Sequence, residues 1–230
     1  MRYRLGKEIV VGLGGSIVCP AGVNTAFLRK FHRFVSRITA SGHKVVVVIG
    51  GGGVAREYQK AAGALIRVTN EDKDWLGIHA TRLNAHLIRT VFRDTADPVV
   101  WDNEKKVGRL KYKVTVASGW HPGWSTDYVA FAIAKKLNIK EVIVAGKPDF
   151  VYGGDPAKDP QAEKFERMSW PEYAKLIPKT WNPGMHATVD PVAARLGARQ
   201  GIRAIVLDGR NLKNFRALLR GGSFRGTIIG

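Results

Sequence analysis

Short apolar runs alternate with segments of helical period along the chain. Residues 45–49 and 142–145 are continuously apolar, as parallel strands covered on both faces are. Between such runs, apolar residues recur every three or four positions, which indicates amphipathic helices. This alternation predicts the α/β class, with a mostly parallel central sheet covered by helices on both faces in a three-layer sandwich.

The pattern also predicts where each element lies. Strands are expected at Glu8–Leu13, Lys44–Ile49, Pro98–Trp101, Lys111–Ala117, Glu141–Ala145, Arg203–Leu207 and Gly226–Ile229. Helices are expected at Thr25–Ala40, Val54–Ala64, Asp72–Phe92, Asp127–Leu137, Ser169–Leu176, Pro191–Gln200 and Leu212–Leu219. In the third helix one buried face is predicted from spacings of three and four, made by Leu76, Ala80, Leu83, Leu87 and Val91.

Length and composition narrow the class of protein. The 230 residues are 45% hydrophobic, which is enough for one large domain and excludes disorder for most of the chain. The single cysteine, Cys19, has no partner for a disulfide or a cysteine-based zinc site. No apolar run is long enough for a signal peptide or a membrane span. These features predict a soluble, cytoplasmic, single-domain protein.

The charge balance leaves several kinds of partner open. The chain has 37 Lys and Arg residues against 19 Asp and Glu residues, a formal net charge of +18. Such an excess fits nucleic-acid binding, attraction of small anions, or a basic solvated surface. Nucleic acid is disfavoured, because the chain has no RNA-binding motif and no basic arm, and its basic residues are dispersed along the sequence.

Two glycine-rich turns follow predicted strands. Residues 12–16, Gly-Leu-Gly-Gly-Ser, offer backbone amides to a phosphate, but Ile17 stands where a dinucleotide-binding fingerprint needs glycine. The chain has no Gly-Lys-Ser/Thr, so it lacks a Walker A loop. Residues 50–53 are four glycines before a helix, with Arg56 in the first helical turn, which suits a terminal phosphate. Both segments could also be tight turns without a ligand.

Two further loops have the composition of a binding site. Residues 118–127 contain hydroxyl groups, two tryptophans, a histidine and Asp127, and they lie where loops of open α/β sheets bind ligands. Residues 146–156 offer a lysine, aromatic rings and acids. Packing, a helix cap or a surface loop remain alternatives. His79 and His86 lack a third metal ligand, and no Ser-His-Asp or Cys-His arrangement is evident.

As an ordered set, these segments resemble the amino acid kinase family, and within it the archaeal-type UMP kinases. The resemblance covers nearly the whole chain and includes Asp149-Phe150-Val151-Tyr152, Asp74-Trp75-Leu76-Gly77-Ile78, Thr81-Arg82-Leu83-Asn84-Ala85 and Asp190-Pro191-Val192-Ala193-Ala194. It implies transfer of a phosphoryl group from ATP to UMP with Mg²⁺, in pyrimidine nucleotide biosynthesis, by a protein that is usually hexameric. It further implies a UMP-binding part at about residues 1–138 and an ATP-binding part at about 139–230.

The resemblance also assigns residues to each substrate. ATP would be held by Gly12, Leu13, Gly14, Gly15, Ser16, Gly52, Arg56, Gly146, Lys147, Tyr152 and Asp155. UMP would be held by Gly51, Asp74, Trp120, His121, Pro122, Gly123, Trp124, Ser125 and Thr126. Asp127, Arg56 and Gly15 are the candidate catalytic residues, with Asp127 organising neighbouring cations or the metal. Because the substrate phosphate is itself the nucleophile, no catalytic serine or cysteine is required.

Two departures from the family pattern affect these assignments. Gly12 stands where bacterial members have a lysine, so Arg56, Lys7 or Lys147 must supply the bridging cation. Residues 146–150 read Gly-Lys-Pro-Asp-Phe where the family has Thr-Asn-Val-Asp-Gly, which changes the adenine side of the site. Two alternatives stay open: a family kinase with another acceptor, and a non-catalytic nucleotide or oxoanion binding or storage protein of the same fold.

Overall fold

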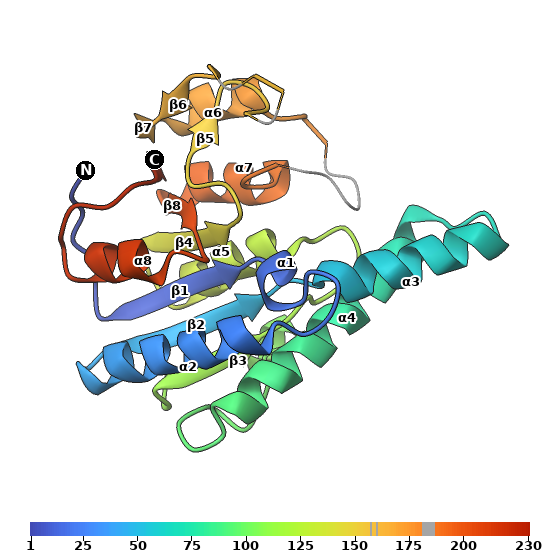
Figure 1. Cartoon of the computed structure of the whole chain (residues 1–230), viewed down its shortest axis with the longest axis horizontal. Coiled ribbons are helices and arrows are strands. Elements are labelled where there is room, and N and C mark those ends of the chain that lie inside the picture. Colours follow the sequence, from blue (N-terminus) through green and yellow to red (C-terminus); the bar gives the residue numbers. More distant parts are fainter. Residues whose placement is uncertain (157, 160, 181–186) are drawn as a thin grey trace.

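The computed structural model describes residues 1–156, 158–159, 161–180 and 187–230. Its centre is a sheet with the strand order β3-β2-β1-β4-β8-β9-β7 (Figure 1). The strands are β1 Glu8–Leu13, β2 Lys44–Ile49, β3 Val114–Ala117, β4 Glu141–Gly146, β7 Arg167–Met168, β8 Arg203–Asp208 and β9 Thr227–Ile229. The first five strands in that order, from β3 to β8, are parallel to one another, whereas β9 runs antiparallel to β8. The mostly parallel sheet is therefore confirmed.

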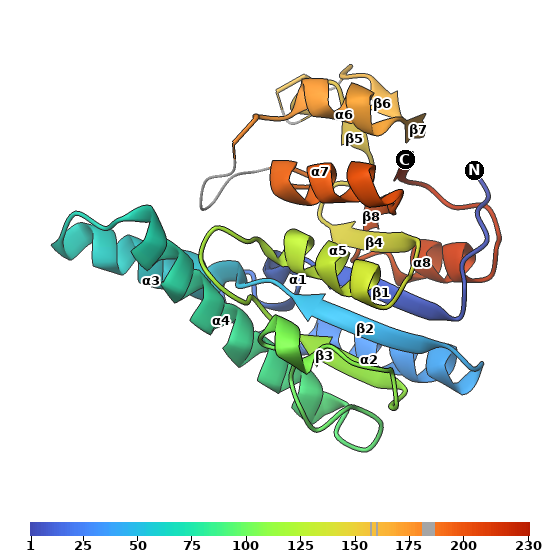
Figure 2. The same ribbon diagram turned by 180° about the vertical axis from the view of Figure 1, so that it is seen from behind.

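Helices cover both faces of the sheet, as the sequence predicts. They are α1 Gly15–Val18, α2 Thr25–Ala40, α3 Gly52–Leu65, α4 Asn70–Val91, α5 Thr126–Lys136, α6 Trp170–Leu176, α7 Pro191–Gln200 and α8 Leu212–Leu219. One apolar cluster joins the sheet to α2, α4 and α8, and a second cluster joins its other face to α5, α6 and α7. Figure 2 shows α5 and α7 in front of the sheet, with α2 behind it.

Local sequence explains why these elements form. Residues 45–49 of β2 are all buried, because helices cover both sides of this central strand. Thr69 and Asp72 form a capping box at the start of α4, and Ser169 and Glu172 form one at the start of α6. Asp190 accepts backbone hydrogen bonds at the start of α7, directly before Pro191.

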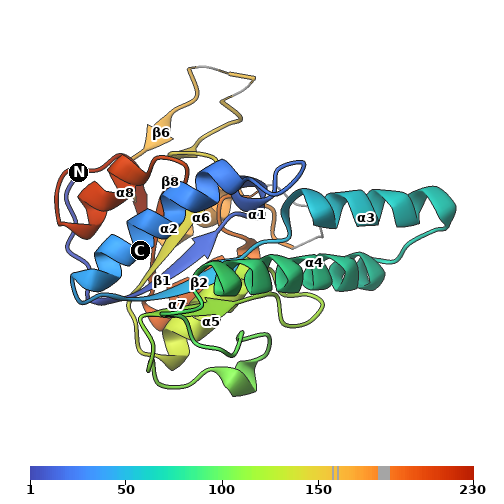
Figure 3. The ribbon, with the colours of Figure 1, turned by 60° about the horizontal axis from the view of Figure 1, so that its bottom comes forward.

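The helical hairpin of α3 and α4 extends beyond the sheet (Figure 3). Only Ala55 of α3 is buried, so this helix packs mainly on α4. No helix within the described part of the chain is long and apolar enough to cross a membrane.

Two local predictions are wrong. Residues 98–101 form no strand, because only Trp101 makes an isolated bridge, to Ala117. Leu83 of α4 is 64% exposed, since the buried face is instead made by residues such as Ile78, Ala85 and Ile88. Both errors have one cause: apolar residues on the protruding hairpin and in the 94–113 connection are not all directed at the core.

The irregular segment before α6 also contains more structure than its composition indicates. Two short strands, β5 Val151–Tyr152 and β6 Lys164–Phe165, pair antiparallel as a small separate sheet. Residues 104–106 form a single 3₁₀ turn.

The order of the strands determines where a ligand can bind. The chain places β2 and β3 on one side of β1 and β4 and β8 on the other, so the direction of winding reverses between β1 and β4. Crevices at the carboxyl ends of strands flanking such a reversal are the usual ligand sites of open α/β sheets. The backbone N–H of Gly14 donates to the carbonyl oxygen of Ala145 at 3.0 Å, which joins the two strand ends at this point.

Candidate active site

Two cavities lie side by side at the carboxyl ends of the parallel strands. The first, about 340 Å³, is lined by the start of α3, by α4 and by the loop before α5. The second, about 590 Å³, is lined by the turn after β1 and the turn after β4. The two share a wall made by Ser16, Arg56, Thr126, Asp127 and Ala187. A group bound in one cavity would therefore face a group bound in the other.

The two glycine turns pack against one another at this wall. A methyl group added to Gly15 would lie 2.3 Å from the backbone nitrogen of Gly52, so no side chain fits there. Gly52 itself has φ +67°, in the left-handed region that favours glycine. The side-chain amide of Asn84 donates to the carbonyl oxygens of Gly50 and Gly51 at 2.9 and 3.0 Å. These contacts hold the amides at the start of α3 beside the first cavity, where an anion would be stabilised.

Arg56 provides the cation between the cavities. Its guanidinium donates to Ser16 Oγ at 3.1 Å and to the carbonyl oxygen of Pro20 at 3.2 Å. Arg56 lines the second cavity together with Gly12, which stands where bacterial members of the family have a lysine. Lys147 lines the second cavity only. Lys7 is excluded as the bridging cation, because it precedes β1 at the opposite end of the sheet and lies beside Gly42.

Asp127 is the acid at the shared wall. Burial and, to a lesser extent, the nearby carboxylate of Asp190 raise the pKa of its carboxyl to about 7, while a hydrogen bond from the Asp190 backbone opposes this shift. Within the described residues, no Lys or Arg forms an ion pair with it. A methyl group at Gly12 would lie 3.7 Å from Asp127 Oδ1, so this carboxyl faces the end of β1. Such a site favours a bound cation.

Asp190 and Ser125 connect the helices on either side of the site, and we call this pair the clasp. Ser125 Oγ accepts from the Tyr128 backbone at the start of α5 and donates to Asp190 Oδ2. Asp190 Oδ1 accepts from the backbones of Val192 and Ala193, at 2.7 and 3.1 Å, at the start of α7. The clasp thus joins the N-termini of α5 and α7 and brings Asp190 close to Asp127 in the first turn of α5.

Asp74 faces the first cavity from α4. Its Oδ2 accepts a hydrogen bond from the backbone of Gly123 at 2.8 Å, which ties the 118–125 loop to the helix. Burial raises the pKa of this carboxyl, and the Gly123 bond opposes the shift. Thr81 holds the same loop, because its Oγ1 accepts from the Gly119 backbone at 2.8 Å.

The structure brings most of the residues predicted for ATP to one place. The second cavity is lined by Gly12, Leu13, Gly14, Gly15, Ser16, Arg56, Gly146 and Lys147. Gly52 lines the first cavity instead. Tyr152 and Asp155 line neither cavity, and the Tyr152 hydroxyl donates to Asp149 Oδ1 at 2.7 Å.

The residues predicted for UMP divide into two groups. Gly51, Asp74, Trp124, Ser125 and Thr126 line the first cavity, whereas Trp120, His121, Pro122 and Gly123 do not. Trp120 is 4% exposed, and its indole nitrogen donates to the carbonyl oxygen of Trp101 at 3.1 Å. Its ring therefore belongs to the core. His121 is exposed and its ring packs on Trp124, with ring centroids 3.5 Å apart.

The sequence assigned no substrate to several residues that line the cavities. They include Gln59, Gly77, Ile78, Thr81 and Gly119 in the first cavity, Ile17, Pro148 and Thr188 in the second, and Asp190 beside Asp127. Asp190 belongs to the segments that carry the family resemblance, but the sequence assigned it no role in the site. The one available signal was the acid-proline pair itself, since nothing local shows that α7 begins at the wall of a cavity.

Comparison with known proteins agrees with this geometry. The model of the amino acid kinase family matches residues 7–208. The chain belongs to the amino acid kinase family. It is 33% identical over 227 residues to the uridylate kinase of Pyrococcus abyssi, covering 96% of this chain and 99% of that protein. It is 37% identical over 225 residues to that of Halorubrum lacusprofundi, covering 96% and 92%.

Solved structures of this family share the fold. The crystal structure of uridylate kinase from Archaeoglobus fulgidus superimposes with a TM-score of 0.82 at 30% identity, over 100% of both chains. UMP kinase from Bacillus anthracis gives a TM-score of 0.81 at 19% identity, over 97% of this chain and 96% of that one, and this supports the fold alone. The family and the fold expected from the sequence are thus confirmed.

Proposed function

We propose that the protein transfers the γ-phosphoryl group of ATP to UMP, giving UDP and ADP. The observation that carries the proposal is the pair of adjoining cavities with Arg56 and Asp127 in their common wall. Relatives of similar length that carry the name uridylate kinase support UMP as the acceptor. We assign UMP to the first cavity and ATP to the second. Residues from both the proposed acceptor part, at about 1–138, and the proposed nucleotide part, at about 139–230, line each cavity.

In the proposed reaction an oxygen of the UMP phosphate attacks the γ-phosphorus of ATP. The new P–O bond forms as the bond between the γ-phosphorus and the bridging oxygen breaks, and ADP leaves with that bond's electron pair. The protein positions the two anions in line and neutralises their charge. Arg56 supplies a fixed positive charge between the phosphates, and the amides at the start of α3 stabilise the acceptor phosphate.

The residues at the shared wall also fit a magnesium ion. Asp127 is a buried carboxyl without a basic partner among the described residues, and a divalent cation would hold it ionised. No cluster of three acidic, histidine or cysteine side chains occurs in the part of the chain that the structure describes. Mg²⁺ commonly binds through one or two carboxylates and substrate phosphates, so Asp127 would hold it together with ATP. Bound there, it would neutralise charge on the transferred group.

The test is an assay of purified protein with Mg²⁺ and ATP against the four nucleoside monophosphates and carbamate. UDP formed from UMP, with little turnover of the others, supports the proposal. Turnover of another acceptor would identify a family kinase of different specificity. Binding of nucleotide or oxoanion without phosphoryl transfer would favour the binding or storage function.

The assignment of the cavities has its own test. Lys147 lines only the second cavity, so Lys147→Ala should raise the Kd for ATP about tenfold, as expected for loss of one charge-assisted contact, and leave the Kd for UMP unchanged. Isothermal titration with each nucleotide measures both. An unchanged Kd for ATP would remove Lys147 from the ATP site.

We also propose a cytoplasmic hexamer. Exposed apolar side chains on the α3–α4 hairpin support contact with further copies, since Leu65 is 83% exposed, Ile66 68% and Leu83 64%. The buried, unpaired thiol of Cys19 suits a reducing compartment. Light scattering should give six times the chain mass of 25.3 kDa. A mass of one or two chains would contradict the hexamer.

A further inference from the structure

The helices α2 and α8 lie side by side on one face of the sheet, on the side opposite α5 and α7 (Figures 1 and 3). Their contact is apolar, with the ring centroids of Phe34 and Phe215 5.0 Å apart. The N-terminal segment runs along the same region. The Phe224 backbone donates to the Met1 carbonyl oxygen at 2.9 Å just after α8, and Lys7 lies beside Gly42 just after α2.

These three segments share one property, which is that they carry basic residues and no acidic ones. We define the α2–α8 face as Arg2, Arg4, Lys7, Arg29, Lys30, Arg33, Arg37, Lys213, Arg216 and Arg220. All are exposed except Arg216, which is partly exposed. The first acid beyond the segment 1–7 is Glu8, which pairs with Lys44 at 3.7 Å.

The arginine residues of α2 form a row. Arg29, Arg33 and Arg37 recur every four residues, so they form a row about 6 Å apart and about 12 Å long on the outer side of α2. Phe27, Phe31 and Phe34 on the other side of the helix are buried. Arg2 and Arg4 alternate with Tyr3 and Leu5, which pack against the core.

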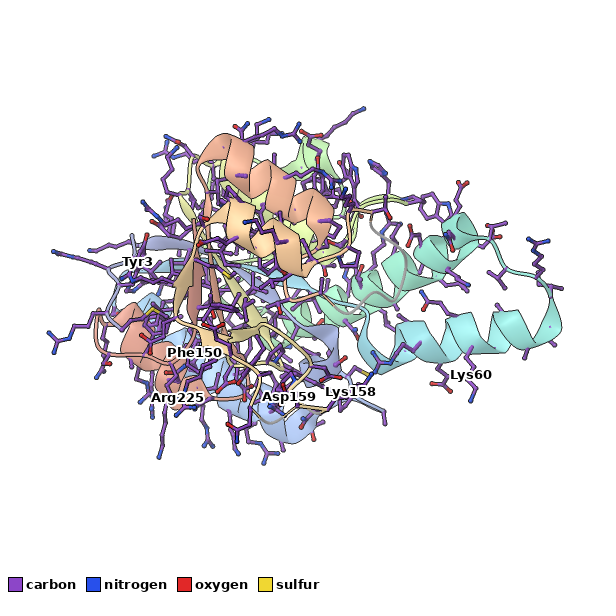
Figure 4. All side chains as sticks on the ribbon, turned by 90° about the horizontal axis from the view of Figure 1, so that it is seen from above. Tyr3, Lys60, Phe150, Lys158, Asp159 and Arg225 are labelled. Carbon is purple, nitrogen blue, oxygen red and sulfur yellow. The ribbon has the colours of Figure 1, made fainter. Side chains whose placement is uncertain are left out.

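The cations of this face are also not neutralised within the protein. Among the described residues, none of the ten takes part in an ion pair. The contrast is with Arg225, which pairs with Asp149 at 3.3 Å and lies over the ring of Phe150 (Figure 4). An uncompensated basic surface of this size attracts polyanions at long range.

We propose that the α2–α8 face binds the phosphate backbone of a nucleic-acid duplex without regard to base sequence. One strand of a duplex carries a phosphate every 3.4 Å along its axis, so the arginine row of α2, about 12 Å long, spans about three to four phosphates. None of the large apolar side chains exposed in the described structure belongs to α2, α8 or residues 1–7, so the face offers no ring for stacking on unpaired bases. An anionic membrane fits less well, because the apolar side of α2 is buried in the core and has nothing to insert.

The charge on this face is not used by the proposed reaction. The face continues to the far end of the sheet, at Lys7 and Arg37, while both cavities open at the carboxyl ends of the strands. Binding of a duplex and phosphoryl transfer are therefore separable properties. Loss of one by mutation need not affect the other.

The test compares two triple variants of equal charge change. The first variant, Arg29→Glu/Arg33→Glu/Arg37→Glu, reverses the charge of the arginine row on α2. The second variant, Lys105→Glu/Arg109→Glu/Lys111→Glu, reverses the charge of three exposed cations on the opposite face of the sheet. Fluorescence anisotropy measures binding of a labelled 20-base-pair duplex at several salt concentrations. We expect the first variant to bind at least tenfold more weakly, with a log–log salt slope shallower by about 2.7, at about 0.9 per lost phosphate contact. The second should change affinity by less than about threefold.

Other outcomes overturn the proposal. Equal loss in both variants would show that net charge alone attracts the duplex, and no binding by the unmodified protein at 50 mM salt would remove the function. Binding to vesicles of anionic lipid but not to the duplex would identify a membrane surface. A lower kcat/KM for UMP in the first variant with unchanged duplex affinity would assign the face to substrate capture.

If the first variant melts at a lower temperature than the unmodified protein, the variant Lys213→Glu/Arg220→Glu, at the two ends of α8, repeats the test independently. We expect it to lower the affinity for the duplex about fivefold.

Discussion

At the scale of single residues, the proposed function depends most on Arg56. It lines both cavities and is held by Ser16 Oγ and the Pro20 carbonyl oxygen, so its charge is fixed before any substrate binds. A charge that is already oriented stabilises a transition state without a cost of reorganisation. The four glycines that precede it on the chain allow the phosphates to approach this close to the backbone.

We expect Arg56→Met to lower kcat by about 10²- to 10³-fold, because it removes a fixed charge from the transferred phosphoryl group. The matched control is Lys60→Met, one turn further along α3, where the side chain points away from the body of the protein (Figure 4). Steady-state kinetics of both variants measure the effect. Equal turnover by the two variants would contradict the role of Arg56.

The clasp between Ser125 and Asp190 is a second residue-scale feature. We expect Ser125→Ala and Asp190→Asn each to lower kcat, and the double variant to lower it by little more than either, because both remove the same link to Asp127. Asparagine still caps a helix, so loss of stability alone would be small in Asp190→Asn. The control is Ser125→Thr, which keeps the hydroxyl group and should therefore keep kcat close to that of the unmodified protein. Additive losses would mean that the two residues act independently.

At the scale of elements, the helical layer made by α5, α6 and α7 depends on close packing of α7. A methyl group added to Gly197 would lie 2.6 Å from the Trp170 ring and 2.7 Å from the Phe131 ring, so α7 approaches α5 and α6 too closely for any side chain. The same helix begins at Asp190 in the clasp. Its packing therefore affects both the core and the site.

We expect Gly197→Ala to lower the free energy of unfolding by about 1–3 kcal/mol through overpacking. Gly63→Ala in α3 is the matched control, because a methyl group there meets nothing within 4 Å. It should raise stability by about 0.5–1 kcal/mol, since alanine favours the helix. Denaturant unfolding measures both, and a destabilised Gly63→Ala together with an unaffected Gly197→Ala would refute this interpretation of the packing.

At the scale of the whole molecule, we propose two separable uses for the net charge of +18. Ten of the cations gather on the α2–α8 face, while the others are distributed over the remaining surface. A positive surface also raises the local concentration of anionic substrates, at rates that decline as salt screens the field.

We therefore expect kcat/KM for UMP to decrease as ionic strength rises, while kcat at saturating UMP and ATP stays constant. Measurement of both parameters between about 50 and 500 mM salt is the check, a range over which the screening length becomes several-fold shorter. Viscosity controls separate capture from chemistry. A kcat/KM that is insensitive to salt would leave the charge without a role in substrate capture.

The sequence by itself determined the elements and the chemistry at their ends. Six of the seven predicted strands occur, although β3 begins at Val114 rather than Lys111, and all seven predicted helices occur close to the expected bounds, because periodicity reports which side of an element meets the core. Glycine turns after buried strands predicted the end of the sheet where the two cavities lie, because such a turn is specified by a few consecutive residues. The errors at 98–101 and Leu83 occurred where an apolar residue has no local sign of its tertiary neighbours.

Only the tertiary structure decided which of the candidate residues come together. It placed Trp120 in the core, separated Lys7 from the site, and joined Asp190 to Asp127 across 63 positions of sequence. It also gathered basic residues that are dispersed along the chain, in segments 1–7, 29–37 and 213–220, onto one face. The physical reason is the same in each case: the energy of a contact or a field depends on distance in space, which the order of residues does not specify.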